Sequence, residues 1–330
     1  MWAVLYFICF GLGYPTLNRY DSRAVGGLSD SVDYYRLVTD GPAALSSHVR
    51  FRILVPFLAR PFARVAEGRL GTWNPVYFGL LVVNAFFTAT TSYLLVLVGR
   101  KLLYDDRLAI LGAAAYLLNF EIANNRLTPL VDSAEGCFFM ALTWSLFSRR
   151  FWTLPLWGVL GAMAKESFVP FATVFTAVWC LSAHRREQWK LAEVLASLST
   201  GLAALVTVML VQATVSGQVV LPWNFAATLR GSVNLGPLIA NIVDKNLLYG
   251  FLWLLPLGVW QLPCFPRPWI FACAAAVATD LVLVAYYGAA PGTAARAIFS
   301  IAGPLLSLSV ATLASQFGGD RTAPSSVPPT

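Results

Sequence analysis

Uninterrupted apolar runs are the feature of this sequence that most limits what it can fold into. One of them, "VYFGLLVVNAFFTATTSYLLVLVG" at 76–99, exceeds the roughly 20 residues that a helix needs to cross the hydrocarbon core of a bilayer. A backbone in lipid must satisfy its own amide groups, which favours helices. Hydrophobic residues make up 58% of the chain and charged residues 12%, unlike a water-soluble globule. The sequence therefore predicts an all-α, polytopic membrane protein.

Charge, proline and glycine divide the apolar runs into about ten predicted transmembrane helices. Their ranges are 2–17, 76–98, 107–121, 131–148, 152–164, 167–183, 191–214, 247–262, 268–288 and 297–315. We expect a single transmembrane domain, 1–317, with a long first loop over 18–75 and a disordered tail over 318–330. The first segment lacks a positively charged start and a small-x-small cleavage site, which favours a retained helix over a signal peptide.

The distribution of lysine and arginine predicts the orientation. With a cytoplasmic N-terminus, the inside loops and the tail hold ten of these residues, and the outside loops after the first hold five. The first loop is an exception with eight arginines, but its length is close to the ~60 residues at which the positive-inside rule loses force. We expect a multi-pass protein of the bacterial inner (plasma) membrane, with its polar site on the periplasmic or extracellular face.

The first loop is predicted to carry short helices at the membrane interface. In "FRILVPFLARPFARVA" at 51–66, apolar residues recur near helical spacing with three arginines among them, which is typical of an interfacial amphipathic helix. Pro56 and Pro61 are expected to kink or divide it. A second short helix over about 30–40 would place two acidic residues on one face, where both carboxylates look into the same cleft.

Polar residues gather on the predicted non-cytoplasmic side. The fifth and sixth helices are short, so Lys165 and Glu166 between them are expected below the outer surface, inside the protein. Asp280 falls within the ninth helix, where an ionisable group requires a partner or a wet cavity. Other polar residues on the outer turns are Asp30, Asp33, Glu121, Asn124, Asn125, Arg126, Asp132, Glu135 and Arg296.

Each of these residues also has a purely structural explanation. Asp30 and Asp33 are suited to capping a short helix. Lys165 and Glu166 are able to neutralise each other, and Arg296 to anchor at lipid headgroups. The acidic residues at the start of the fourth helix fit its dipole. The convergence of these groups on one face is what favours a functional site.

Several chemistries are disfavoured by composition. The five cysteines lie in or beside apolar segments without CxxC spacing, which predicts small core residues and neither disulfides nor structural zinc. Two histidines are too few for a histidine-based metal centre. The net charge of +7 reflects loop placement and attraction to headgroups, not a nucleic-acid partner. We expect no cofactor and no metal site, with a divalent metal optional.

The first loop also carries a pattern known from a family. It reads "SDSVDYYRLVTD", with an acidic residue before tyrosine, and then the arginine-bearing "VRFRILVPFL" ahead of the second helix. This resembles the GT-C superfamily of polytopic glycosyltransferases, in particular mannosyltransferases that use a polyprenyl- or dolichyl-phosphate sugar. The resemblance covers about the first 70 residues and implies that a first-loop carboxylate is the base. Asp30, four residues before Tyr34, takes that position, with Asp33 as the alternative.

Two later segments extend the resemblance. "GAMAKES" and "TAARAIF" are similar to places where such enzymes contact the donor phosphate through cations. Several branches of the superfamily have an Asp-Glu pair in the first loop, and this chain has no acidic residue adjacent to Asp30. The subfamily is therefore left open.

The predicted function is transfer of a sugar, with mannose as a candidate, from a polyprenyl-phosphate donor to a lipid, glycan or protein acceptor. A carboxylate accepts the hydroxyl proton, and preorganised cations stabilise the departing phosphate. The predicted substrate-binding and phosphate-binding residues are Tyr34, Arg50, Arg52, Arg126, Lys165, Glu166 and Arg296. We expect Asp30 or Asp33 to border one cavity with Lys165 and Arg296, open laterally to lipid.

The main alternative is a multi-pass transporter or lipid-linked-sugar flippase, which would also hold buried charges. Transporters often contain internal repeats, and none is evident here. A noncatalytic scaffold for envelope assembly is a third hypothesis. An acyltransferase is disfavoured because the chain has no HxxxxD motif.

Overall fold

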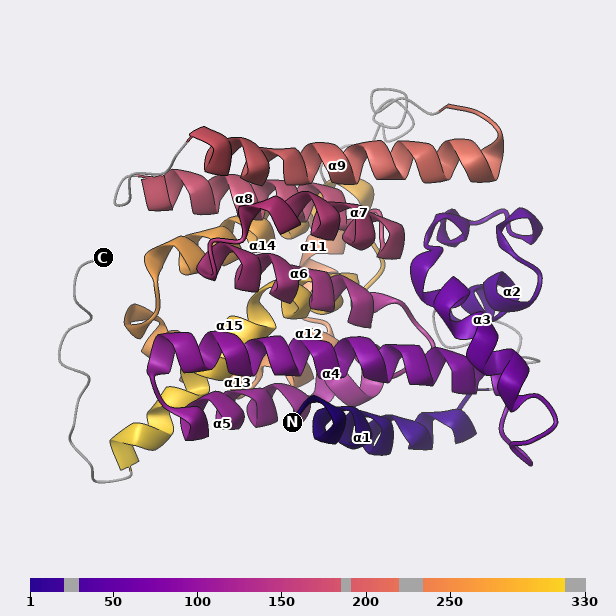
Figure 1. Ribbon diagram of the computed structural model, residues 1–330, viewed down its shortest axis with the longest axis horizontal. Helices are drawn as coiled ribbons and strands as arrows, with labels where there is room; N and C mark the ends of the chain where they lie inside the picture. Colours follow the sequence, from indigo (N-terminus) through magenta and orange to yellow (C-terminus); the bar gives the residue numbers. More distant parts are fainter. Residues whose placement is uncertain (21–29, 185–190, 220–233, 318–330) are drawn as a thin grey trace.

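The computed structural model describes residues 1–20, 30–184, 191–219 and 234–317. Over these ranges the regular structure is helical and contains no strand, which confirms the all-α class. Figure 1 shows the long helices lying side by side along the longest axis, with α2 and α3 at one end of the bundle. The predicted disordered tail lies outside the described residues.

The apolar runs form helices close to the predicted ranges because each is bounded by polar or turn-forming residues. The helices of the bundle are α1 (Trp2–Gly13), α4 (Pro75–Leu103), α5 (Asp106–Leu117), α6 (Asp132–Phe147), α7 (Leu154–Ala164), α8 (Phe168–His184), α9 (Leu191–Ser216), α14 (Arg267–Tyr287) and α15 (Thr293–Phe317). The helix predicted over 107–121 ends early, at Leu117. It is followed by a short π-helical turn, η4 (Ile122–Arg126).

The helix predicted over 247–262 is broken, so that prediction was wrong in this detail. The segment forms α12 (Lys245–Phe251) and α13 (Leu254–Gln261), and the two parts are bent by 48°. Pro256 lies in the first turn of α13, where its missing N–H costs no intrahelical bond. A further helix, α11 (Leu235–Ile242), precedes the pair and was not among the predicted helices.

Four helices of the described chain are long and apolar enough to cross a membrane: α4, α9, α14 and α15. They become five if the bent pair α12–α13 is counted as one span. The other predicted crossings are shorter; α7, with 11 residues, rises only about 16 Å. These apolar helices are compatible with a membrane protein.

The first loop contains the two predicted short helices, α2 (Ser31–Thr39) and α3 (Leu54–Ala66). The side chains of α3 divide into an exposed face that carries large apolar residues and a buried face made mostly of small residues. Of the two expected effects of the prolines, a kink or a division, the division does not occur. Pro56 falls in the first turn, and Pro61 is accommodated within the continuous helix.

Close packing fixes α3 against α4. A Cβ atom on Gly79 of α4 would stand 2.6 Å from the carbonyl oxygen of Ala59 and 3.0 Å from the amide nitrogen of Ala63. Glycine is therefore required for this approach of the two helices. On the same loop, Arg60 donates hydrogen bonds to the carbonyls of Leu37 (2.9 Å) and Val38 (3.0 Å). These contacts hold α2 and α3 at the end of the bundle.

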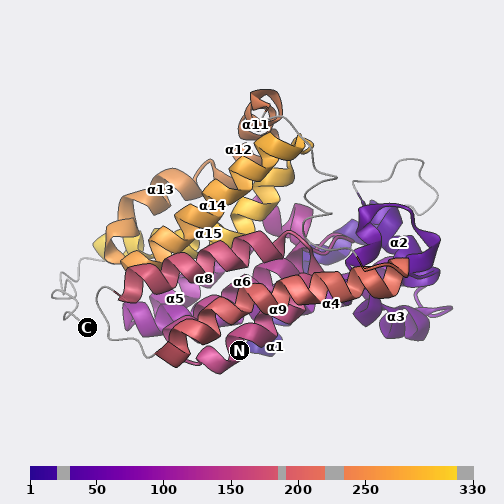
Figure 2. The same cartoon turned by 90° about the horizontal axis from the view of Figure 1, so that it is seen from above.

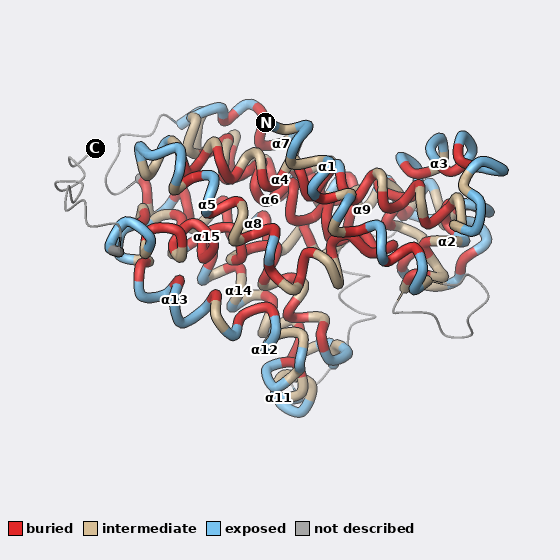
Figure 3. The backbone as a smooth tube through the Cα atoms, turned by 90° about the horizontal axis from the view of Figure 1, so that it is seen from below, coloured by how far each residue is buried: buried red, intermediate tan, exposed pale blue. Residues whose placement is uncertain are grey.

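The buried core runs along the centre of the bundle, while α3, α11 and α13 carry many exposed residues (Figure 3). Figure 2 shows α11, α12, α13 and α14 along one flank of the molecule, with α1 and α9 toward the other. Aromatic pairs join the layers: Tyr116 of α5 stacks on Phe299 of α15 at 5.2 Å, and Phe139 of α6 meets Phe168 of α8 at 4.8 Å. The starts of α6, α8 and α15 lie at the end that carries α2 and α3, because Arg52 of the first loop pairs with Glu166, Ser167 bonds Glu135 and Arg296 bonds Asp132.

Candidate functional site

Eight charged side chains meet at the end of the bundle that carries α2 and α3. We name them the charged cluster, and its members are Asp30, Arg52, Arg126, Asp132, Glu135, Lys165, Glu166 and Arg296. They come from the first loop, the η4 turn, α6, the α7–α8 turn and the start of α15. Four cations face four carboxylates, so burial of the group is offset by pairing within it.

Arg52 forms one half of the cluster. Its Nε and Nη2 atoms donate to the two carboxylate oxygens of Glu166 at 2.8 and 2.5 Å. Its Nη1 atom donates to the hydroxyl oxygen of Tyr34 at 2.9 Å and lies 3.5 Å from Oδ2 of Asp30. This bidentate geometry is the strong form of an arginine–carboxylate contact. Through Arg52, the first-loop residues Asp30 and Tyr34 are connected to Glu166 in the α7–α8 turn.

Asp132 forms the other half. Lys165 Nζ donates to its Oδ1 atom at 2.7 Å, and Arg296 Nη1 donates to its Oδ2 atom at 3.2 Å. Lys165 also lies 3.3 Å from Oε2 of Glu135. Two carboxylates at the start of α6 therefore hold the mid-chain lysine and the late arginine together.

Hydroxyl groups complete the environment of Glu135. Ser167 donates to its Oε1 atom at 2.8 Å and Ser300 to its Oε2 atom at 3.2 Å. Both carboxylate oxygens therefore have donors, as buried ionised groups require. Glu135 connects α6 with the start of α8 and with α15.

Arg126 braces the cluster from the η4 turn. Its Nη1 atom donates to the backbone carbonyl of Asp132, and its Nη2 atom donates to the backbone carbonyl of Arg296. Its guanidinium also lies over the ring of Phe299, 5.6 Å from the centroid. Arg126 is buried, and both of its Nη atoms are engaged by these backbone carbonyls.

Lys165 and Glu166 join the two halves of the cluster through the backbone. Lys165 ends α7 in an extended conformation, with φ −161° and ψ 133°. Consecutive side chains of an extended segment point to opposite sides. Lys165 accordingly reaches Asp132, whereas Glu166 reaches Arg52. The two residues do not neutralise each other, which rules out the simplest structural explanation of the pair.

The local charges shift the pKa values of the Arg52 half. Burial alone would raise the pKa of Glu166, but the Arg52 guanidinium outweighs it and lowers that pKa to about 2. Burial lowers the pKa of Arg52, while Glu166 and Tyr34 raise it, and the net direction is upward. Burial also raises the pKa of the Tyr34 hydroxyl. Glu166 and Arg52 are thus both charged at neutral pH.

The first-loop aspartates differ in their partners. Asp30 occupies the N-cap position of α2, but its side chain makes no capping hydrogen bond and turns to Arg52. Asp33 accepts a hydrogen bond from Ser47 Oγ at 2.9 Å. The expectation that both carboxylates look into one cleft is therefore not met, because only Asp30 joins the charged cluster.

Arg50 lies just before this half of the cluster. Its guanidinium packs over the ring of Phe51, 4.7 Å from the centroid. Its Nε atom is buried without a hydrogen-bond partner among the described residues. Arg50 is not part of the ion-pair network.

The structure gives Asp132 and Glu135 a larger role than the sequence suggested. Both lie in the first turn of α6, where acidic residues are common because of the helix dipole. Neither caps the helix, and both receive cations from other segments. Their distance from the start of an apolar run resembles that of a cap, so no sequence signal distinguishes the two roles.

Two further buried carboxylates lie close to the cluster. Asp280 of α14 is buried within reach of the charges of Lys165 and Glu135. Its Oδ2 atom has no hydrogen-bond partner in the described part of the chain. Glu121 receives a hydrogen bond from Asn125 at 2.8 Å. We expected Asp280 to have a partner or a wet cavity. Among the described residues, its charged neighbours are Lys165 and Glu135.

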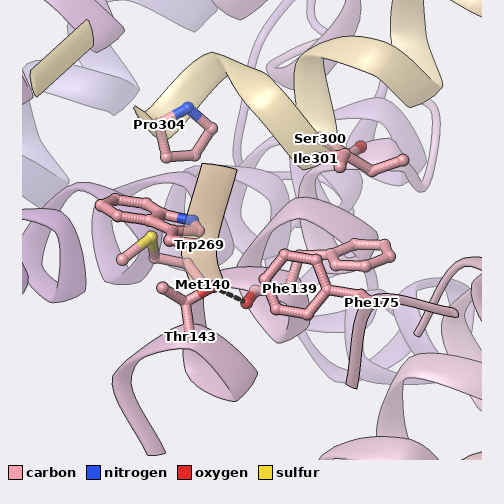
Figure 4. A pocket seen from close by; sticks show the side chains of 8 residues that line it. All are labelled: Phe139, Met140, Thr143, Phe175, Trp269, Ser300, Ile301 and Pro304. Carbon is pink, nitrogen blue, oxygen red and sulfur yellow. Dashed lines mark hydrogen bonds between the residues drawn. The ribbon is translucent and has the colours of Figure 1, made fainter. Parts of the chain in front are cut away.

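A narrow crevice lies beside the cluster in the core (Figure 4). It is too narrow to hold a water molecule. Aromatic and aliphatic side chains line it together with Thr143 and Ser300, and Ser300 also donates to Glu135. Asp30, Lys165 and Arg296 do not border this crevice. Asp30 is ion-paired with Arg52, whereas Lys165 and Arg296 are ion-paired with Asp132.

No family model matches the sequence, and no curated protein matches it significantly.

The arrangement combines preorganised cations with one partly exposed carboxylate. The side chain of Asp30 is 32% exposed, whereas that of Asp132 is 2% exposed. Among the described residues, no group of three or more His, Cys, Asp or Glu side chains has the geometry of a metal site. The chemistry available to these residues is proton acceptance at Asp30 and binding of an anion by the nearby cations.

Proposed function

We propose that the protein is an integral-membrane glycosyltransferase that moves a sugar from a polyprenyl-phosphate donor to a hydroxyl acceptor. The observation that carries the proposal is the connection of Asp30, through Arg52 and Glu166, to the turn that contains Lys165. Sugar transfer from a lipid phosphate needs a proton acceptor and cations in this proximity.

Asp30 is the proposed base. Its partly exposed carboxylate is able to meet an acceptor hydroxyl directly, and it has no capping role at α2. The nearby guanidinium of Arg52 stabilises the negative charge that develops on the departing phosphate. A single displacement with inversion at the sugar requires only this one base, unlike glycoside hydrolysis with its two carboxylates.

The membrane setting supports a lipid-linked donor. The apolar helices of the bundle end at the charged cluster, so an isoprenoid tail is able to approach between helices while its phosphate stays at the cluster. We propose ten membrane crossings, a cytoplasmic N-terminus and a cluster on the periplasmic face of a bacterial inner membrane. The excess of lysine and arginine on the opposite loops supports this orientation.

The test is turnover by the purified full-length protein in nanodiscs. A panel of polyprenyl-phosphate sugars, beginning with mannose, is supplied with an extract of envelope lipids and glycans as acceptors. We expect loss of the lipid-phosphate sugar and appearance of free polyprenyl phosphate. The proposal fails if no member of the panel is consumed while the protein remains folded.

A transporter or flippase is the second candidate, and the broken pair α12–α13 favours it. Discontinuous helices and buried charges such as Asp280 are typical of transport proteins. Movement of a fluorescent lipid-phosphate sugar across proteoliposomes, without its consumption, would identify this function. The same panel of donors therefore separates the two candidates.

A further inference from the structure

The cations of the charged cluster differ in how easily a ligand is able to reach them. Arg126 donates to two backbone carbonyls, and Lys165 lies against carboxylates that are almost completely buried. A ligand that displaced the Asp132 carboxylate from Lys165 and Arg296 would leave a buried charge unpaired, which is strongly unfavourable. Glu166, the partner of Arg52, is 26% exposed. Its longer side chain is able to carry the carboxylate into water.

The contact between Arg52 and Glu166 has the geometry of phosphate recognition. Two guanidinium nitrogens donate to two oxygens of one anionic group, at 2.8 and 2.5 Å. A phosphate group presents pairs of oxygens to the same fork. The carboxylate of Glu166 therefore occupies the place that two phosphate oxygens would take.

Tyr34 adds a donor at the same place. Its hydroxyl oxygen accepts a hydrogen bond from Arg52 Nη1 at 2.9 Å. The phenolic proton is then free to be donated, and no acceptor for it is found among the described residues. Tyr34 is buried, so a ligand that accepts this proton gains a hydrogen bond shielded from water.

We propose that Arg52 and Tyr34 form the phosphate-binding seat of the protein, and that Glu166 is its resting counter-ion. A phosphate-bearing lipid displaces the Glu166 carboxylate from the fork of Arg52. The Arg52–Tyr34 hydrogen bond remains, and Asp30 stays beside the bound group. The inference rests on the proposed function in that it takes the bound anion to be the donor phosphate.

The test compares two probes that differ only in the phosphate, farnesyl phosphate and farnesol. Binding to the full-length protein in nanodiscs is measured by calorimetry, without turnover. The wild type is expected to prefer farnesyl phosphate. Glu166→Gln should bind farnesyl phosphate about tenfold more tightly, because a neutral amide competes less strongly for Arg52 than a carboxylate does. Farnesol binding should not change.

A second variant and a matched control complete the design. Arg52→Gln is expected to abolish the preference for farnesyl phosphate. Asp106→Asn removes an exposed carboxylate that pairs with Arg100 at the opposite end of the bundle, and it should leave both affinities unchanged. Thermal unfolding shows whether each variant is folded.

An absence of gain in affinity would mean that Glu166 only fixes the first loop in place through its ion pair with Arg52. In that case a folded Glu166→Gln variant binds farnesyl phosphate no more tightly than the wild type, and the inference is overturned. If Glu166→Gln does not fold, Glu166→Asp replaces it. The shorter carboxylate cannot fill the fork, so a two- to threefold gain is expected, and an absence of gain overturns the inference.

The binding measurement is independent of sugar transfer. If the variants behave as expected but no lipid-phosphate sugar is consumed, the seat stands and the glycosyltransferase proposal falls. If sugar is transferred while Glu166→Gln gains no affinity, the seat falls and the transferase proposal stands.

Discussion

The Nη1 atom of Arg296 lies 3.2 Å from the Oδ2 atom of Asp132, although 164 residues separate them in the chain. Lys165 Nζ occupies the other oxygen of the same carboxylate at 2.7 Å. One buried side chain at the start of α6 therefore holds the end of α7 and the start of α15. The position of both cations depends on it.

Replacement of Asp132 by asparagine should be strongly destabilising. The amide has a similar shape, but it leaves Lys165 and Arg296 without their buried counter-charge. The expected loss in the free energy of unfolding is about 3–5 kcal/mol. Chemical unfolding in detergent measures it. Asp106→Asn is the control, because this carboxylate is 68% exposed, and its change should stay within about 0.5 kcal/mol.

The contribution of Glu166 to stability should depend on pH. Its pKa is lowered from 4.5 to about 2 in the folded protein, so the ionised form stabilises folding above the unfolded pKa. This stabilisation is lost as the pH falls from about 4.5 to about 2. The difference in unfolding temperature between wild type and Glu166→Gln should be constant from pH 7 to 5. Below pH 4.5 it should shrink, and a difference that grows there would contradict the Arg52–Glu166 contact.

Asp30→Asn should reduce the rate of sugar transfer by about 10²- to 10⁴-fold, the usual effect of losing a general base. Asp33→Asn should have a smaller effect, since Asp33 accepts a hydrogen bond from Ser47 and does not contact Arg52. Initial rates at saturating donor measure both. The reverse order would assign the base to Asp33. If both variants keep the wild-type rate, neither residue is the base.

A methyl group on Gly79 should loosen the first loop. In Gly79→Ala the new Cβ atom would stand 2.6 Å from the Ala59 carbonyl oxygen, so α3 must move away from α4. The expected loss is about 1–3 kcal/mol. Gly11→Ala in α1 is the matched control, because its Cβ meets no atom within 4 Å, and a helical alanine should be neutral or stabilising. Equal unfolding temperatures for the two variants would show that the close approach is unimportant.

The ten crossings and the cytoplasmic N-terminus that we propose would place the C-terminus in the cytoplasm as well. Two reporters are fused separately after residue 330. Green fluorescent protein should fluoresce there, and alkaline phosphatase, which is active only in the periplasm, should be inactive. A fusion in the first loop, between α2 and α3, should give the opposite result. A periplasmic C-terminus would contradict the even number of crossings.

The helices were predictable from the sequence because hydrophobic runs of the required length have few other structures available in lipid. The break between α12 and α13 was missed although a signal was present. Pro256 is tolerated only near the start of a helix, so a helix that contains it is expected to begin within a few residues before it. The two parts are bent by 48°, and Gly250, just before the break, lies against the side chain of Glu121.

The candidate site was predictable only as a set of residue types. The sequence identified Asp30, Lys165 and Arg296 as outer-face groups, but it contained no information on which carboxylate each cation meets. The pairs are separated by 22 to 164 residues, so no local spacing encodes them. Asp132 and Glu135 were recognised as outer-face acids but were not assigned to the site, because an acidic first turn is an ordinary feature of helices.

The extended conformation of Lys165 determines to which side of the α7–α8 turn each following side chain points. Because alternate side chains leave an extended strand on opposite sides, insertion of one residue between Lys165 and Glu166 would send the glutamate toward Asp132 and Glu135. Three carboxylates would then surround one lysine, and the contact of Arg52 with Asp30 at 3.5 Å would be the one carboxylate contact left to it, beside its hydrogen bond to Tyr34. The length of this turn is therefore more tightly constrained than the identity of its apolar neighbours.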